Sequence, residues 1–69
     1  MAGAVPNFQV GDRVRIDFCD RQGEIISPPV AVLVNGGRDT EYHVGLRWQD
    51  GKVSPSYNTD YLELVYGVR

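Results

Sequence analysis

Residues 41–54, EYHVGLRWQDGKVS, decide the fold of this 69-residue chain. Large apolar side chains take every second place over the first eight residues, which is the period of a half-buried β-strand. The apolar face holds Tyr42, Val44, Leu46 and Trp48, and the opposite face holds Glu41, His43, Gly45 and Arg47. QDGK has the composition of a hairpin turn, and VSPSY, residues 53–57, continues as a short strand with an edge-type proline. The stretch therefore predicts a β-hairpin with one buried face.

Two further strands precede this hairpin. GDRVRIDF, residues 11–18, alternates cleanly, and its apolar residues, Phe18 included, fall on one face. GEIIS, residues 23–27, begins a second strand. We expect Pro28-Pro29 to interrupt its ladder, because proline has no N–H donor.

The remaining elements are equally short. VAVLV, residues 30–34, ends at Asn35-Gly36, a tight-turn pair because both residues tolerate positive φ. NTDY, residues 58–61, predicts one helical turn, and LELVY, residues 62–66, predicts the last strand. The pattern as a whole indicates an all-β fold, a strongly bent five-stranded small barrel with a short helical turn before the last strand. The expected core is Val10, Val14, Ile16, Ile25, Val44, Leu46, Val53, Leu62 and Leu64.

Length and composition limit the other possibilities. A chain of 69 residues forms one domain, which we place at residues 10–66, after a flexible N-terminal arm at residues 1–9. No stretch approaches the ~18 apolar residues of a membrane helix, so we expect a soluble protein without a membrane partner. Cys19 is the only cysteine, which excludes an internal disulfide and is compatible with the cytoplasm. The net charge of −2 disfavours nucleic acid as a partner, although six of the seven basic residues are arginine.

Four segments together resemble a known fold: GDRVRI, QGEII, YHVGLRWQDGKVS and DYLELV. They resemble the Src-homology-3-like small barrel of the KOW and Tudor superfamilies. They are also similar to an actinobacterial family of uncharacterised small barrels with the pattern GDRV…GEI…VRWxDG. The resemblance covers roughly residues 10–65 and implies the fold, but this scaffold carries many unrelated activities.

The Tudor resemblance implies an aromatic cage for a methylated lysine or arginine, whose ring faces attract the cation. Phe18, Trp48 and Asp50 match three cage positions. Lys52, however, stands where that family has an aromatic residue after DG, and the turn CDRQG lacks the second aromatic. A lysine there would repel a methylated cation, so the sequence does not favour a methyl-reader.

GDRVR followed by a QG pair and two apolar residues also resembles type II dihydrofolate reductase, an oligomeric enzyme built from similar barrels. That family has a lysine directly after GDRVR and a VQIY tetrad in its pore. Ile16 occupies the lysine position, and VSPSY, residues 53–57, replaces the tetrad. A reductase-like oligomer lacking the usual active-site residues is therefore the least favoured of three hypotheses.

No catalytic constellation is apparent. His43, the only histidine, lies on the strand face opposite the core and is expected to be an exposed surface residue. Cys19 falls in a turn without a predicted base, and no Ser-His-Asp arrangement is indicated. Asp17, Asp20 and Glu24 are typical of a solvated acidic turn. We therefore predict a protein that is not an enzyme and has no cofactor and no metal.

Two features favour binding instead. Aromatic residues gather where the loops of such a barrel converge, and they form either a shallow groove or a cap over the core. VAVLV places Leu33 either on an exposed projecting hairpin or in a strand buried on both sides. We predict an interaction module that docks a protein partner, or a second copy of itself, through the 30–34 hairpin and the aromatic end. The predicted contact residues are Trp48, Tyr57, Tyr61, Phe18, Asp50, Val32 and Leu33.

The second hypothesis is a KOW-like nucleic-acid-binding module. Arg13, Arg15 and Arg47 alternate with core residues and would lie on outer faces near an aromatic side chain. A steep loss of binding with added salt would support this hypothesis.

Overall fold

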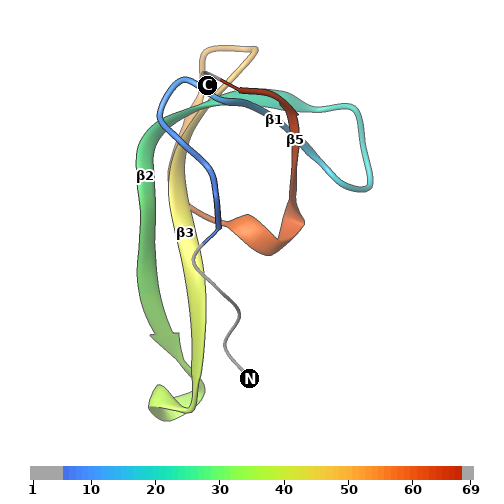
Figure 1. Ribbon diagram of the computed structural model, residues 1–69. Coiled ribbons are helices and arrows are strands. Elements are labelled where there is room, and N and C mark those ends of the chain that lie inside the picture. Colours follow the sequence, from blue (N-terminus) through green and yellow to red (C-terminus); the bar gives the residue numbers. More distant parts are fainter. Residues whose placement is uncertain (1–5, 68–69) are drawn as a thin grey trace.

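The computed structural model describes residues 6–67, which form five strands and two short 3₁₀ turns (Figure 1). The strands are β1 (Arg13–Ile16), β2 (Gln22–Val34), β3 (Asp39–Trp48), β4 (Val53–Asn58) and β5 (Leu62–Tyr66), and the turns are η1 (Asn35–Gly37) and η2 (Thr59–Tyr61). All pairings are antiparallel, in the order β4-β3-β2-β1-β5. The all-β prediction is confirmed, including the helical turn before the last strand. Of the predicted N-terminal arm, residues 1–5 lie outside the described residues.

The sheet curls strongly, because β2 runs along β3 and then bends over to meet β1 (Figure 1). The turn η1 joins β2 to β3 with Asn35 at φ 55° and Gly36 at φ 70°, as the Asn-Gly pair predicts. No helix within residues 6–67 has the length and hydropathy to cross a membrane.

The two prolines do not end β2, which continues through them as one strand. The ladder with β3 is nevertheless irregular here, because its register shifts twice: Ile25 lies opposite Leu46, Ser27 opposite Gly45, and Val30 opposite His43. Each shift adds one residue to β2. Two added residues restore the original alternation, so Ala31 and Leu33 return to the face that Ile25 occupies in the core.

The core lies inside the curl of the sheet and consists of Val14, Ile16, Ile25, Val44, Leu46, Trp48 and Leu62. Six of these seven residues were predicted. Trp48, only 3% exposed, is the addition. Phe8 and Tyr57 pack against the cluster from outside.

Three predicted core residues are exposed instead. Val10 is 52% exposed because it lies in the turn before β1. Val53 is 53% exposed because its register partner on β3 is the exposed residue Arg47, which puts both on the outer face. Leu64 is 41% exposed because β5 is an end strand with a neighbour on one side only. Phe18, predicted to continue the alternation of the first strand, does not do so, because β1 ends at Ile16 and Phe18 follows in an exposed turn.

The far part of β2 and β3 projects from the body as a two-stranded ribbon (Figure 1). We call this the distal ribbon and define it as Val30–Val34 paired with Asp39–His43. On one side β1 pairs with β2 only at Gln22–Glu24, and on the other side β4 reaches β3 no further than His43. Within residues 6–67, the outer edge of Val30–Val34 and the outer edge of Asp39–Tyr42 are therefore without a strand partner.

Candidate functional site

The edge of β2 in the distal ribbon is apolar and open. Val30 is 57% exposed and Leu33 is 69% exposed, while Val32 and Val34 are half-buried. Exposed strand edges are usually protected by charged residues, prolines or bulges, because they can pair with another chain. Here Pro28-Pro29 provides protection only at the base, and no charged residue follows before the turn at Asn35. The result is a window of five uncharged residues, Val30–Val34, whose outer side has no strand partner among the described residues. The alternative of a strand buried on both sides is wrong.

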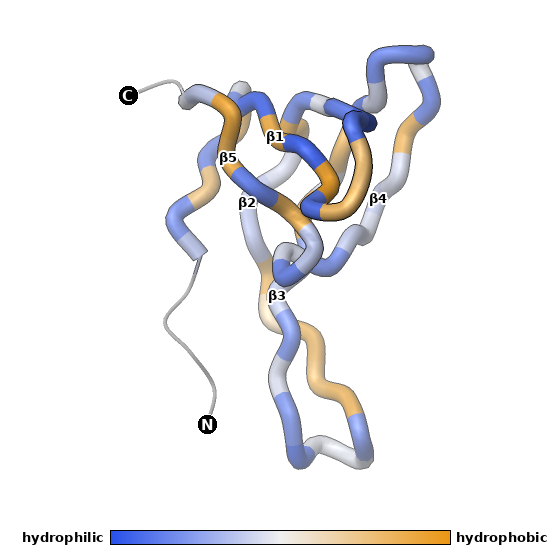
Figure 2. Tube along the Cα trace, turned by 90° about the vertical axis from the view of Figure 1, so that its right-hand side faces the viewer, coloured by the Kyte–Doolittle hydropathy of each residue, from blue (hydrophilic) through white to orange (hydrophobic). Residues whose placement is uncertain are grey.

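The edge of β3 in the same ribbon has the opposite character. Asp39 and Glu41 lie directly opposite Val34 and Val32, and share their face of the ribbon. Figure 2 shows the contrast, with one hydrophobic strand and one mostly hydrophilic strand in the ribbon. Charged side chains discourage strand addition, so β3 is a protected edge and β2 is not.

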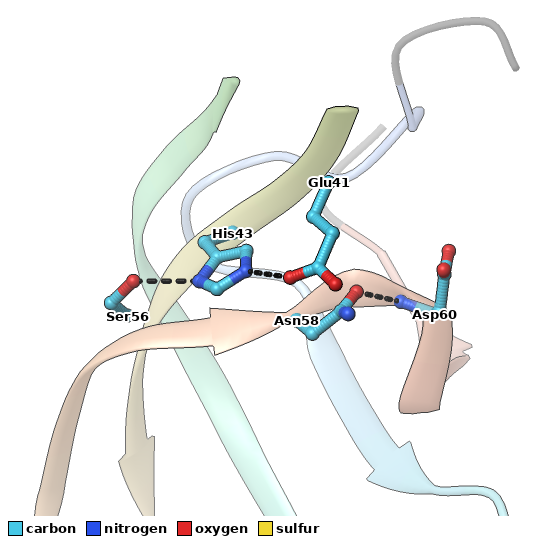
Figure 3. Close-up of polar contacts among 5 residues, drawn as sticks. All are labelled: Glu41, His43, Ser56, Asn58 and Asp60. Carbon is cyan, nitrogen blue, oxygen red and sulfur yellow. Dashed lines mark hydrogen bonds and ion pairs between the residues drawn. The ribbon is translucent and has the colours of Figure 1, made fainter. Parts of the chain in front are cut away.

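A line of polar side chains lies at the base of the distal ribbon (Figure 3). His43 Nδ1 is 2.7 Å from Ser56 Oγ, and His43 Nε2 is 2.9 Å from Glu41 Oε1. A neutral imidazole with its proton on Nε2 satisfies both contacts, since the Ser56 hydroxyl donates to Nδ1 and the Nε2–H donates to the Glu41 carboxylate. The side chain of His43 is only 18% exposed, so the expectation of an exposed surface histidine is wrong.

The reason for this error is tertiary. Alternation correctly places His43 on the face opposite the core, but β4 lies alongside β3 and brings Ser56 to the ring. Glu41 and His43, two residues apart on one strand, were visible in the sequence as neighbours on one face. The serine has no such local signal. At the end of β4, Asn58 accepts a hydrogen bond from the Asp60 backbone N–H and caps η2 (Figure 3).

The arrangement of Ser56, His43 and Glu41 has two features of a catalytic triad. A base lies next to a hydroxyl, and a carboxylate orients that base. Acyl transfer also needs a walled site with donors for the oxyanion. A surface hollow of about 380 Å³ lies at Arg13, Glu24, Arg47, Trp48 and Gln49, and none of the three residues of this arrangement lines it. The contact of His43 with Ser56 links β3 to β4 beneath the ribbon.

The predicted aromatic contact residues do not come together as one binding surface. They are Phe18, Trp48, Tyr57 and Tyr61. Trp48 is a core residue whose Nε1–H donates to Ser54 Oγ at 2.8 Å. Its ring meets Tyr57 edge to face at 5.4 Å between centroids, and the guanidinium of Arg21 lies 4.2 Å over it. Trp48 thus offers little ring surface to a ligand. Asp50, another predicted contact residue, accepts a hydrogen bond from the Lys52 backbone N–H in the β3–β4 turn.

Phe18 and Tyr61 are the exposed members of the predicted set, at 76% and 52%. Both lie near the junction of β1 and β5, where the Asp17 backbone N–H donates to the Tyr61 carbonyl at 3.0 Å. Both lie apart from the distal ribbon, since β1 and β5 take no part in it.

The three arginines of the nucleic-acid hypothesis have different surroundings. Arg15 pairs with Glu63 at 2.7 Å. Arg13 and Arg47 lie in one row across three strands, with Glu24 between them, and line the hollow beside Trp48. An acidic residue between the two arginines reduces the positive potential of this row.

The fold and the open edge together describe a small all-β domain in which the edge of β2 carries no charged side chain over Val30–Val34. Comparisons of the chain with protein-family models, with curated proteins and with solved structures found no match.

Proposed function

We propose that this protein is a non-enzymatic interaction module that binds an extended protein segment by strand addition at Val30–Val34. The observation that carries the proposal is the five-residue edge of β2, which is exposed, uncharged and unpaired among the described residues. In this proposal the body of the protein is a Src-homology-3-like small barrel that acts in the cytoplasm. The exposed thiol of Cys19 is compatible with a reducing compartment.

Strand addition draws its affinity from main-chain hydrogen bonds and its selectivity from alternate side chains. In an antiparallel ladder every second residue directs both its N–H and its C=O to one side, so five residues offer roughly four to six hydrogen bonds. Val30 and Leu33 would add apolar contact to the incoming strand. Each such cross-strand pair contributes about 0.2–1 kcal/mol, which favours a modest, reversible interaction.

The aromatic end has a smaller part in this proposal. Trp48 and Tyr57 hold β3 and β4 in place, because their rings pack on each other at the rim of the core. Phe18 and Tyr61 are the residues of that end whose rings are free to touch a partner.

A peptide selection tests the proposal. Extended peptides of random sequence would be selected against the wild-type chain, and their binding would be compared with the Leu33→Lys variant, which places a charge on the β2 edge. Val53→Lys is the matched control, because Val53 is also an exposed strand residue but lies outside the distal ribbon. We expect Leu33→Lys to abolish binding and Val53→Lys to retain it, with slowed amide exchange at residues 30–34 in the complex. Equal binding to both variants would show that the edge is not the site.

Nucleic acid is the second candidate, supported by the two arginines beside Trp48 in the hollow. A single-stranded oligonucleotide titrated at low and high salt separates the two candidates. Binding that falls steeply with salt and is lost in Arg13→Gln and Arg47→Gln, but not in Leu33→Lys, would favour it.

A further inference from the structure

The edge proposed above as the binding site also has a chemistry that selects its occupant. We infer that the strand bound at this edge is β2 of a second copy of this chain. The two β2 strands pair antiparallel about a two-fold axis that passes beside Val32. This inference rests on the proposed function, because it needs the edge of β2 to accept a strand.

The charge pattern of the distal ribbon favours this arrangement over the other ways of joining two copies. Pairing β3 to β3 would bring Asp39 and Glu41 of one chain against the same acids of the other. Pairing β2 of one chain to β3 of the next would leave a free edge at each end and lead to an open filament. Pairing β2 to β2 places no charge at the contact and closes with two copies.

The ends of the open edge set the register. Pro28-Pro29 removes two N–H donors at the base of the window, and the Asn35–Gly37 turn ends it at the tip. An axis beside Val32 maps residues 30–34 onto themselves, so Val30 faces Val34 of the second copy and Ala31 faces Leu33. Moving the axis by one residue toward the base brings Pro28 into the ladder. Moving it by one residue toward the tip brings the turn into it.

This register also separates the acids. The combined ribbon has the strand order β3-β2-β2-β3, and the Glu41 side chains of the two copies lie three strand spacings apart, about 14 Å. That distance exceeds the Debye length of about 8 Å at physiological salt, so the two carboxylates repel each other weakly.

The alternating faces of the two ribbons also match. Leu33 of each copy lies beside Ala31 of the other, on the face that continues from the core. Leu33, 69% exposed in the single chain, thereby gains an apolar neighbour. The contact is one strand pair, smaller than the ~1,200 Å² of a standard stable complex. We therefore expect a dimer that dissociates on dilution.

Cysteine cross-linking tests both the dimer and its register, in a Cys19→Ser background that removes the native thiol. Val32→Cys puts two thiols directly opposite each other at the axis, where the Cα atoms of facing residues are about 4.5–5.5 Å apart, within the range of a disulfide. Val34→Cys is the matched control, because Val34 is half-buried on the same face. In the inferred register the two copies of residue 34 are about 14 Å apart, too far for a disulfide.

Under mild oxidation we expect Val32→Cys to form a covalent dimer at least tenfold faster than Val34→Cys. Light scattering should show the unmodified chain passing from monomer to dimer as its concentration rises. A monomer at every concentration, with slow cross-linking of both variants, overturns the inference. Equal cross-linking of both variants also overturns it, because that result indicates a parallel or unspecific contact.

The failure of this inference is distinguishable from failure of the proposed function. A strictly monomeric chain whose residues 30–34 still bind selected peptides, with loss in Leu33→Lys, refutes the dimer and leaves strand addition intact. A dimer that persists in Leu33→Lys, with residues 30–34 exchanging their amides as fast as in the monomer, refutes the β2–β2 pairing. If residues 30–34 of the wild-type chain also bind none of the selected peptides, the proposed function is refuted as well.

Discussion

Two glycines that face the same ladder from opposite strands provide a sharp test of the packing between β2 and β3. A Cβ atom added to Gly23 would lie 2.9 Å from the backbone carbonyl oxygen of Arg47 and 3.2 Å from the Trp48 ring. A Cβ added to Gly45 would collide with the side-chain oxygen of Ser27 and lie 3.3 Å from an Ile26 side-chain carbon. The chemical change is the same, and neither glycine has a positive φ. The two sites differ in what must move.

The expected magnitudes follow from that difference. At Gly23 the obstacle is backbone and a buried ring, so Gly23→Ala overpacks the ladder at a cost of about 1–3 kcal/mol. Replacing glycine by alanine also reduces the conformational entropy of the unfolded chain, which stabilises the fold by about 0.4–1 kcal/mol. With the middle of each range, the net destabilisation is about 1.3 kcal/mol, which corresponds to a fall in Tm of roughly 5–10 °C for a domain of this size. At Gly45 the Ser27 hydroxyl can rotate away, so Gly45→Ala should stay within about 0.5 kcal/mol of wild type.

Urea unfolding followed by the fluorescence of Trp48, the single tryptophan, measures both variants against wild type. Circular dichroism at low denaturant checks that each variant keeps its strand content. Equal stability of the two variants, or a Gly23→Ala variant as stable as wild type, would refute the close approach of β2 to β3 at this point.

Three further changes test the site. Trp48→Phe removes the hydrogen bond to Ser54 and should lower the free energy of unfolding by about 1–2 kcal/mol, measured by chemical denaturation with tyrosine fluorescence. In a double-mutant cycle, His43→Ala and Ser56→Ala should show a coupling energy of about 1 kcal/mol, whereas strict additivity would mean that their contact contributes nothing. Leu33→Lys should change stability by less than about 0.5 kcal/mol, because the side chain is 69% exposed; a large loss of stability would place Leu33 in the core.

Most of the strand set could be predicted from local pattern. The alternation around Val44 and Leu46, the turn at Asn35-Gly36 and the helical turn before β5 each depend on a few neighbouring residues, and each is confirmed. Val53 and Leu64 were misplaced because alternation identifies a face but not whether another strand covers it.

The candidate site was less predictable. VAVLV was visible as an unusual apolar run, but its exposure depends on how far β1 and β4 extend along their neighbours. The hydrogen-bonded line through His43 needs Ser56 from another strand, so no local signal could reveal it. Trp48 matched a binding position in sequence, and only the structure shows how little of its ring remains open, because Trp48 is 3% exposed with Tyr57 and Arg21 packed on it.

The sequence by itself determined which segments are strands and which of their faces is apolar, because a period of two is a property of neighbouring residues alone. The tertiary structure decided what each face and edge meets. The shortness of β1, which pairs with β2 only at Gln22–Glu24, leaves the outer side of Val30–Val34 without a strand within the described residues. Two register shifts turn Leu33 back to the face of the core. Both depend on pairing between residues distant in the chain, since a strand edge is open or closed according to which other strand lies beside it.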